Sequence, residues 1–522
     1  MIDGITGCSL QFFKLMKKSP AFNKSDPIIL SLIVILAFYL RSRHLDAAAM
    51  WIDEAFRFSH SSQPLRGMFL QYAADNHPPL YGLVLHFWMA RCDSLLWLRF
   101  LSVIFSAFSL PVLWLLYRAF LPGRQAMFAV FLTAVAPFHI SMAQEMNYPS
   151  MMFFLSSIAL LGAVYFSARP ELRYLVVYIV FSIAALLTHY NAAFLVFSIN
   201  AALVIYFLAE RAWKPMWIWL GGQVALTVAG LTLAGSLPSQ AQRVLGLLPA
   251  ENILAHLRSL PVGGIPRVYE ALLLGVHFEP KGAANITMLA AMLLIAVAGA
   301  ALTWRVMRRS EKLIVFVIIF LTPVVGFGMM LATGLYFSPK YYFYLLPLLL
   351  VMLLRGWGSI GSATARRVVF AAVALIFLVS AARYYNRLEV PEDNATVITY
   401  IEENFSDGDL LLVNPPYLSL LFDFYAPGKL FPLGIPDNFH RKKPYRDIRH
   451  VTDGDLKSLK ENAGRFERVW VFYGLGTKTR VDPDGRMARL FEDDCGIEEK
   501  RAFSVAPFDY QSGSLFVFKN CR

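Results

Sequence analysis

Residues 49–86 read AMWIDEAFRFSHSSQPLRGMFLQYAADNHPPLYGLVLH, and they carry Asp53, Glu54, Asp75, Asn76 and His77 in a chain that is otherwise apolar. The stretch follows directly after the first hydrophobic segment of the chain. A segment of that kind is a candidate membrane span, so we expect the polar groups behind it to lie at a membrane face. This loop is the leading candidate for the floor of a functional cavity.

The composition is that of a membrane protein. Of the 522 residues, 57% are hydrophobic and only 16% are charged, whereas soluble proteins carry roughly 25% charged residues. The mean hydropathy is +0.51. The net charge of +12 is better explained by basic cytoplasmic loops that contact anionic lipid headgroups than by a nucleic-acid partner.

Eleven segments are apolar enough to be membrane-spanning helices. Such a helix needs about 20 mostly apolar residues. The first segment is short, so we expect Arg41 and Arg43 at its end to reach toward the interface. The predicted spans are 26–43, 98–118, 126–143, 150–167, 174–190, 192–209, 215–235, 284–304, 313–334, 341–355 and 368–383.

The apolar segment Pro78–Cys92 decides the topology. It has only about 15 residues, so it is either an interfacial or re-entrant helix or a twelfth crossing. If it does not cross, the basic links between spans all fall on the side of the N-terminus, which the positive-inside rule favours. The N-terminus is then cytoplasmic and the C-terminus extracytoplasmic. One extracytoplasmic face then carries Asp53, His77, Gln144, Glu145, His189, the loop 236–283 and Lys340.

The chain divides into three parts. Residues 1–25 form a cytoplasmic N-terminus, 26–383 a transmembrane domain that includes the first outer loop 44–97, and 384–522 a small extracytoplasmic α/β domain. We expect the first span to be an uncleaved anchor, because no small-residue cleavage site follows it. Cys495 and Cys521 both lie in the last part and could pair if it is exported. The sequence leaves that open, since it does not supply their Cα separation.

Three acids are candidates for a general base. Asp53 and Glu54 follow Trp51 at the membrane interface, and Glu145 lies in a short link between two spans. Each is either a solvated rim residue or a cavity residue. Partial burial among the apolar neighbours of Asp53 would raise a carboxyl pKa toward the range useful to a general base.

Two helix starts are candidates for binding an anionic group. Asn76 can cap the helix that Pro78 opens, which would place His77 at the helix mouth. Lys340 stands in the first turn of a span, followed by Tyr341, where free N–H groups and the helix dipole favour a bound phosphate. Without an anion, a lysine there opposes the dipole. His139 and His189, near outer ends of spans, fit packing or hydrogen-bonding roles, and no firm metal-ligand spacing occurs.

Several motifs occur together in an order that resembles a known family. They are WIDEA (51–55), NHPPLY (76–81) before LRFLSVIF (98–105), APFHISMAQEM (136–146), LTHY (187–190) and KYYFYLLP (340–347). They resemble bacterial polyprenyl-phosphate-sugar glycosyltransferases of the GT-C type, in the family-39 group of protein O-mannosyltransferases and lipid A aminoarabinose transferases. The resemblance covers roughly residues 25–355, and the C-terminal domain is similar only in kind.

The resemblance implies an inverting sugar transfer from a polyprenyl phosphate to a hydroxyl acceptor at the outer face of the bacterial inner membrane. Asp53 would be the general base, with Glu54 the alternative, and Glu145 would bind the acceptor or share that task. Substrate-binding roles would fall to His77, Asn76, Lys340, Tyr341, Gln144 and His189. No nucleotide or redox cofactor is needed. The lipid A transferases have Glu-Lys where this chain has Asn76-His77, which leaves use of a divalent metal in doubt.

Alternatives remain open for the acceptor and for the class of function. Lipid A or its core sugar, a surface glycan, another lipid or a protein could accept the sugar. Loop 236–283 is too short for the lumenal domain of the eukaryotic mannosyltransferases. A lipid or glycan flippase would place ionisable residues near mid-membrane and show paired broken helices. Polar residues here gather at one rim, which favours an enzyme. A membrane-anchored sensor would leave the Asp53 loop without a role.

Overall fold

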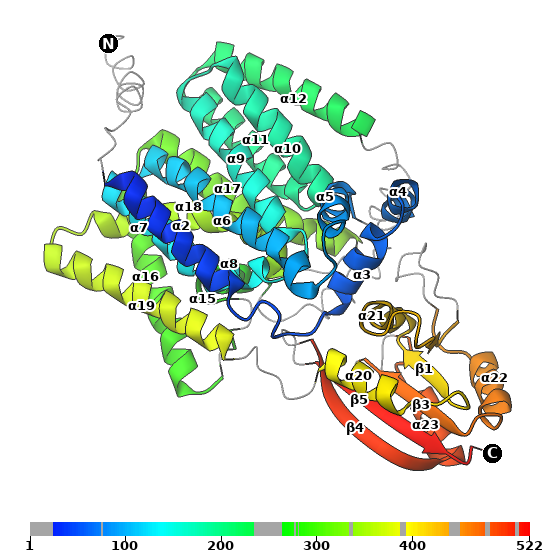
Figure 1. Ribbon diagram of the computed structural model, residues 1–522. Helices are drawn as coiled ribbons and strands as arrows, with labels where there is room; N and C mark the ends of the chain where they lie inside the picture. Colours follow the sequence, from blue (N-terminus) through cyan, green and yellow to red (C-terminus); the bar gives the residue numbers. More distant parts are fainter. Residues whose placement is uncertain are drawn as a thin grey trace, which may run out of the picture. The chain divides into compact units, whose positions relative to one another are not determined.

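The computed structural model describes residues 25–74, 77–233, 264–275, 278–279, 281–333, 338–386, 393–437, 449–474, 481–506 and 511–521. It divides into two compact units (Figure 1). We call Met1–Arg43, His77–Tyr81 and Arg99–Tyr384 the helical unit. His44–Asn76, Gly82–Leu98 and Tyr385–Arg522 form the sheet unit.

Every predicted span coincides with a helix or a pair of helices. Seven of the described helices are long and apolar enough to cross a membrane, and the bent pair α7/α8 makes eight. This confirms a multi-pass helical membrane protein, whereas the count of eleven spans stays a prediction. The helices are α2 (Asp26–Ser42), α6 (Leu95–Phe120), α7 (Gly123–Val135), α8 (Pro137–Ala143), α9 (Pro149–Ala168), α10 (Leu172–Thr188), α11 (Ala192–Ala209), α12 (Trp213–Leu233), α15 (Gly264–Leu274), α16 (Ala283–Val306), α17 (Arg309–Thr333), η1 (Pro339–Leu345), α18 (Leu346–Gly358) and α19 (Ala363–Tyr385).

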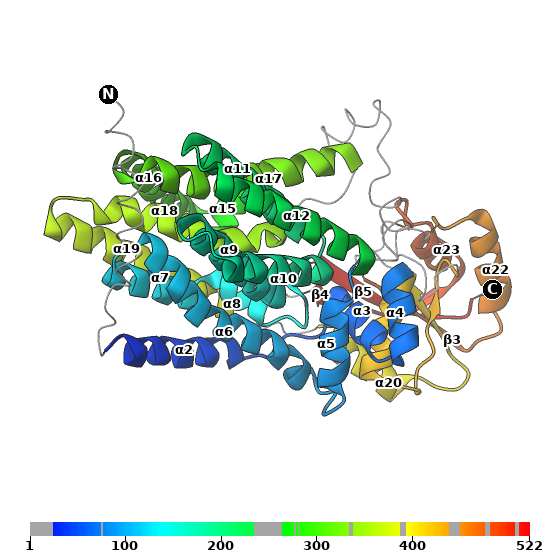
Figure 2. The same ribbon diagram turned by 90° about the horizontal axis from the view of Figure 1, so that it is seen from above.

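Glycines let two helix pairs in this unit pack backbone to backbone. Figures 1 and 2 show α9, α10 and α12 side by side. At Gly162 on α9, a Cβ atom would lie 2.8 Å from the backbone nitrogen of Tyr178 on α10. At Gly356 on α18, it would collide with the carbonyl of Gly299 on α16. Small residues at such contacts are the usual way for helices to associate in a lipid environment.

The predicted span 126–143 is broken between α7 and α8, which meet at an angle of 53°. Pro137 has no N–H group, so it cannot bond the carbonyl four residues earlier, at Thr133. The guanidinium of Arg41 supplies the missing donors, because it donates to the carbonyls of Ala134 (2.9 Å) and Thr133 (3.4 Å). The expectation that Arg41 reaches toward the interface is therefore wrong. Its side chain is fully buried, whereas Arg43 is exposed.

The sheet unit contains a five-stranded mixed sheet of strand order β2-β1-β3-β5-β4. β1 pairs in parallel with β2 and β3, and β5 pairs antiparallel with β3 and β4. This confirms the predicted α/β character of the C-terminal part. The elements are α20 (Asn394–Asn404), β1 (Leu410–Asn414), η2 (Pro416–Leu418), α21 (Ser419–Tyr425), β2 (Leu433–Gly434), α22 (Asp453–Ala463), β3 (Arg468–Tyr473), α23 (Arg486–Asp494), β4 (Gly496–Ala506) and β5 (Gln511–Lys519).

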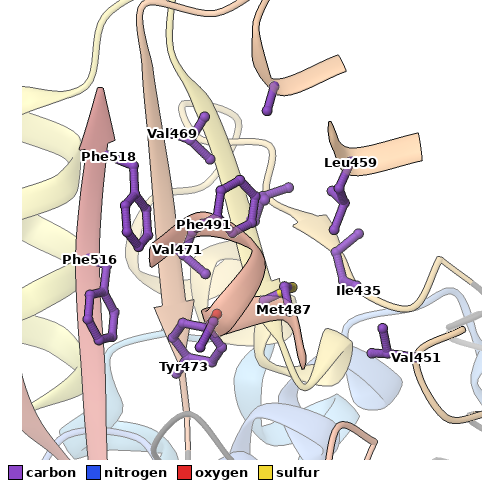
Figure 3. Close-up of a cluster of buried hydrophobic side chains, with 13 residues drawn as sticks. Ile435, Val451, Leu459, Val469, Val471, Tyr473, Met487, Phe491, Phe516 and Phe518 are labelled. Carbon is purple, nitrogen blue, oxygen red and sulfur yellow. The ribbon is translucent and has the colours of Figure 1, made fainter. Parts of the chain in front are cut away.

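Alternate residues of β3 pack on opposite faces of this sheet. Val469, Val471 and Tyr473 point toward α22 and α23, where Leu459 and Phe491 complete a buried apolar cluster (Figure 3). On the other face, Trp470 lies against Tyr400 of α20, and Phe472 lies against Phe422 of α21. The period-2 direction of strand side chains thus explains the layer of helices on each face.

Three short helices of the predicted first outer loop also belong to the sheet unit: α3 (Ile52–Ser61), α4 (Leu65–Ala74) and most of α5 (Leu80–Met89). α5 has ten residues, about 15 Å at 1.5 Å per residue, which is half of what the hydrocarbon core requires. That length agrees with an interfacial helix and not with a crossing. Gly82 makes room for the ring of Tyr72, which a Cβ atom would meet at 2.2 Å.

The first loop packs against the C-terminal part of the chain. Phe58 of α3 meets Phe424 of α21 edge to face at 5.0 Å, and Asn394 donates to the carbonyl of Met50 at 3.1 Å. The structure thus groups this loop with residues 385–522, whereas the sequence-based division placed it with the spans. Such a grouping depends on contacts between segments more than 300 residues apart in the chain.

Cys495 and Cys521 form a disulfide, with Cα atoms 4.3 Å apart. Cys495 stands directly before β4 and Cys521 shortly after β5, so the bond joins the ends of these two paired strands. The sequence left this pairing open, and the antiparallel register of the strands is what brings the two residues together.

Candidate functional site

Three residues that the sequence nominated for substrate binding meet in the helical unit. The imidazole of His189 stacks on Tyr148 at a centroid distance of 4.0 Å and on Tyr341 at 5.6 Å. His77 lies edge-on to His189 at 5.3 Å. These four rings, which we call the aromatic cluster, come from four separate segments of the chain. The cluster packs two imidazoles and two phenol rings together, so it combines aromatic surface with polar ring nitrogens.

His189 ends α10 and is held in one orientation. The backbone N–H of Asn191 donates to its Nδ1 at 3.1 Å, so the neutral imidazole carries its proton on Nε2. The hydroxyl of Tyr344 donates to the carbonyl of Asn191 at 2.9 Å, which ties this turn to η1. His189 is buried, with 7% of its surface exposed. Its Nε2–H group is therefore a fixed donor on one edge of the aromatic cluster.

The link between α8 and α9 places Gln144 and Glu145 next to the cluster in sequence, since Tyr148 ends the same link. Gln144 donates to the carbonyls of Arg41 (3.0 Å) and Arg43 (2.7 Å) and accepts from the hydroxyl of Tyr384 (2.7 Å). Its amide thus joins the end of α2 to the end of α19. Glu145 is buried, with 3% exposed, so its carboxylate is well separated from bulk water.

Lys340 lies in η1, directly before Tyr341 of the aromatic cluster, and is half-buried. The sequence predicted the start of an α-helix here, but Pro339–Leu345 is a 3-10 helix. Its first turn is tighter than an α-helical one, and the N–H of Tyr341 already donates to the carbonyl of Ser338 at 3.1 Å. The α-helical N-terminus on which the predicted phosphate site rested is therefore not formed here, and the charge of Lys340 is what this position offers.

Asp53 and Glu54 lie in the first turn of α3, in the sheet unit. Glu54 is fully buried, and its Oε2 accepts the backbone N–H of Trp51 at 3.2 Å. This is the reach-back bond of an acidic residue that caps a helix start. Asp53 is half-buried. The structure thus gives Glu54 a local structural role, which the sequence could not distinguish from a catalytic one.

Asn76 and its neighbour Asp75 lie outside the described residues. Within the described ranges, no three His, Cys, Asp or Glu side chains gather closely enough to hold a metal ion. His139 is a buried, hydrogen-bonded histidine, as expected, and lies 3.0 Å from the hydroxyl of Ser106 and 3.4 Å from that of Ser109.

Sequence reasoning missed two residues of this region. Tyr148 precedes Pro149, which opens α9, on the rim that also carries Glu145. An aromatic residue at such a helix entrance was a signal that could have been used. Arg41 had no such signal, because its acceptors Thr133 and Ala134 lie more than 90 positions away in the chain.

This chain is similar to known proteins in part of its sequence and in its fold. Residues 76–232 match the family model described as dolichyl-phosphate-mannose-protein mannosyltransferase. No protein of curated function matches the sequence.

Among solved structures, ArnT from Cupriavidus metallidurans in the apo state is 13% identical with a TM-score of 0.55, covering 94% of this chain and 97% of ArnT. The same protein bound to undecaprenyl phosphate is 12% identical with a TM-score of 0.53, and the match covers 95% of this chain and 98% of ArnT. A third structure is the archaeal oligosaccharyltransferase AglB from Archaeoglobus fulgidus, in complex with an inhibitory peptide and a dolichol-phosphate. It is 11% identical with a TM-score of 0.51, and the match covers 91% of this chain and 73% of AglB. At these identities the likeness is one of fold.

Proposed function

We propose that this chain is a GT-C glycosyltransferase, as its sequence motifs predicted, and that it transfers a sugar from a polyprenyl-phosphate donor to a hydroxyl acceptor of the cell envelope. The donor class follows from the polyprenyl phosphates that accompany the solved neighbours. The acceptor is a sugar of lipid A or its core, a surface glycan, another lipid or a protein.

The reaction is a displacement at the anomeric carbon. The acceptor oxygen attacks C1 of the donor sugar as the bond between C1 and the phosphate oxygen breaks, and the configuration at C1 inverts. The electron pair of that bond leaves with the polyprenyl phosphate. The acceptor proton passes to a carboxylate, for which we propose Asp53. General-base help of this kind contributes about 10²- to 10⁴-fold to a rate.

We propose the remaining roles from the chemistry of the side chains and from the family resemblance. Lys340 contacts the leaving phosphate, whose charge grows as the bond breaks. His77, His189 and Tyr341 hold the donor sugar on the aromatic cluster, and Glu145 binds the acceptor hydroxyl or shares the base role. Asn76 remains a predicted contact of the polyprenyl-phosphate-linked sugar. For Gln144 we propose a positioning role, because its amide already joins α2 to α19.

The aromatic cluster is the observation that carries this proposal. It unites His77, His189 and Tyr341, the residues to which the family resemblance gave substrate-binding roles. A purely structural core would need rings but would have no reason to combine two histidines with a lysine and a buried glutamate nearby in sequence. A binding surface for a sugar phosphate needs those groups.

We place the cluster and the sheet unit at the extracytoplasmic face of the bacterial inner membrane. Two observations support this orientation. The Cys495–Cys521 disulfide is typical of an oxidising compartment. Arg118 and Arg366 lie at the opposite helix ends from the cluster, where the positive-inside rule places cytoplasmic residues.

A flippase is the second function class, and no observation favours it. Carriers with inverted repeats have broken helices in corresponding pairs. Among the described helices, α7/α8 is the one bent pair. Its break is filled by the buried Arg41, which donates to the freed carbonyls of Thr133 and Ala134, so that break is a packed structural feature and not an open binding site.

Deletion of the gene tests the proposal, with mass spectrometry of the envelope glycans and lipids. We expect one sugar to disappear, to return with the wild-type gene, and to stay absent with Asp53→Asn expressed at the wild-type level. The polyprenyl-phosphate-linked form of that sugar should accumulate. An envelope identical with and without the gene would contradict a transferase, and loss of the sugar from the lipid carrier itself would indicate an earlier step.

A further inference from the structure

A second cluster of charged side chains lies at the helix ends opposite the aromatic cluster. It surrounds a cavity of about 670 Å³ between the starts of α2, α7 and α19 and the ends of α6 and α18. The far ends of α2 and α19 are the ones that Gln144 joins. α6 alone has 26 residues, about 39 Å, so the cavity lies at the other membrane face from the proposed sugar-transfer site.

The cavity wall carries an excess of positive charge. Three arginines and one carboxylate line it: Arg118, Arg124, Arg366 and Asp26. Arg118 is paired with Asp26 at 3.2 Å and covers the ring of Trp114 at 5.3 Å. This pair neutralises one of the three guanidinium groups, so two positive charges remain for a ligand.

The other two arginines have donors to spare. A guanidinium has five N–H donors. Arg366 uses one in a bond to the carbonyl of Ile360 at 2.9 Å. Arg124 is exposed and makes no hydrogen bond or ion pair with any part of the chain that the structure describes. Paired guanidinium groups of this kind suit a phosphate, which accepts two bonds from each.

The rest of the cavity is apolar and contains one spare acceptor. Phe128 of α7 and Phe370 of α19 stack with centroids 5.0 Å apart and planes 5° apart. The Oε1 of Gln125 is buried and accepts no hydrogen bond from a described residue. Gly358 leaves the room for this side chain, because a Cβ atom there would collide with the amide of Gln125.

We propose that this cavity binds the headgroup of an anionic phospholipid. Its phosphate is bound by Arg124 and Arg366, and its acyl chains follow the rings of Phe128 and Phe370. A phosphate with apolar chains matches a wall that contains both arginines and aromatic rings. Basic pockets between helix ends at the cytoplasmic face are suited to such headgroups.

Native mass spectrometry of the purified full chain, titrated with phosphatidylglycerol, tests the site. Arg124→Gln combined with Arg366→Gln should weaken phosphatidylglycerol binding roughly 25-fold, since each basic residue near a lipid surface contributes about fivefold. Arg367→Gln is the matched control, because Arg367 is exposed on the same helix and does not line the cavity. It should bind within about twofold of the wild type.

Two further binding measurements distinguish an anionic lipid from a neutral lipid and from free phosphate. Phosphatidylcholine should bind much more weakly than phosphatidylglycerol, and millimolar inorganic phosphate should not displace the lipid. Displacement by inorganic phosphate, or equal binding of both lipids, would overturn the proposal. So would equal affinity of the double variant and Arg367→Gln. If the double variant does not fold, Arg124→Gln alone decides, because that side chain has no described partner. The readout is binding, so it is independent of sugar transfer.

Discussion

The ring of Tyr148 stacks on the imidazole of His189, with centroids 4.0 Å apart and planes inclined by 20°. This contact joins the link between α8 and α9, which carries Glu145, to the end of α10. It also fixes one face of an imidazole whose Nδ1 already accepts the N–H of Asn191. The stack therefore packs together two segments of the candidate site that are separate in sequence.

Substitution of His189 distinguishes packing from substrate binding. His189→Phe keeps a ring against Tyr148 but removes both the Nε2–H donor and the Nδ1 acceptor, so the thermal midpoint should fall modestly, because the part-buried N–H of Asn191 loses its partner. Sugar transfer should fall about tenfold or more, the value of one hydrogen bond to a charged group. Transfer assays and differential scanning fluorimetry in detergent give the two readouts. If transfer is unchanged, the histidine serves only to pack.

Asp53→Asn and Glu54→Gln form a matched pair at the start of α3. Loss of the general base in Asp53→Asn should slow transfer about 10²- to 10⁴-fold without weakening donor binding. Glu54→Gln should retain transfer and stability, because a glutamine oxygen also accepts the N–H of Trp51. Single-turnover kinetics check both. The reverse result, an active Asp53→Asn and an inactive Glu54→Gln, would assign the base to Glu54.

Lys340→Ala should raise the KM for the donor about tenfold, since a charge-assisted bond to the phosphate is lost. Lys281→Ala is the control: this lysine is 84% exposed and pairs with Glu279 at 3.0 Å. That variant should leave KM unchanged. The measurement is the donor concentration dependence of initial rates. An unchanged KM in Lys340→Ala would remove this lysine from the phosphate site.

Arg41→Met should destabilise the helical unit by about 3 kcal/mol or more, because buried carbonyl groups lose their donors. Those groups are the oxygen of Ala134 and, in part, that of Thr133, which keeps the N–H of Ala136 at 3.4 Å. Arg43→Met, a change at an exposed position two residues later, should have little effect. Thermal unfolding of both variants in the same detergent checks this. Equal midpoints would show that the break is stable without the arginine.

The start of α22 should lose stability in acid. Hydrogen bonds from Arg449 and from the backbone and hydroxyl of Thr452 lower the pKa of Asp455 from 3.8 to about 2. A lowered folded-state pKa stabilises the fold above the unfolded value, so this contribution is complete above about pH 4 and disappears as the pH falls toward 2.

Hydrogen exchange of residues 453–463 at decreasing pH measures this effect. Protection should fall between about pH 4 and pH 2 in the wild type. Asp455→Asn should already be less protected at pH 6 and should lack the fall. Asp484→Asn, at an exposed position in another turn of the sheet unit, should behave as the wild type does. A wild-type profile in Asp455→Asn would contradict the assignment.

Much of the fold followed from local properties of the chain. Length and hydropathy located the long apolar helices between residues 26 and 383, whereas α15 lies within the predicted loop 236–283 and was not predicted. Short apolar runs between polar stretches indicated the strands of the C-terminal part. Motif order indicated the family. The family resemblance gave substrate-binding roles to His77, His189 and Tyr341, which lie near helix ends on the rim opposite the basic links. From its position alone, His189 fitted packing or hydrogen bonding.

What the sequence determined by itself is the class of protein, the positions of its helices and the set of residues at one rim, since these depend on neighbours along the chain. Tertiary structure alone decided the burial of Arg41, the Cys495–Cys521 bond, the stack of His189 on Tyr148 and the capping role of Glu54. The first three join residues many positions apart, and the last depends on where α3 begins. Such pairings depend on the packing of whole helices and strands, which local hydropathy does not encode.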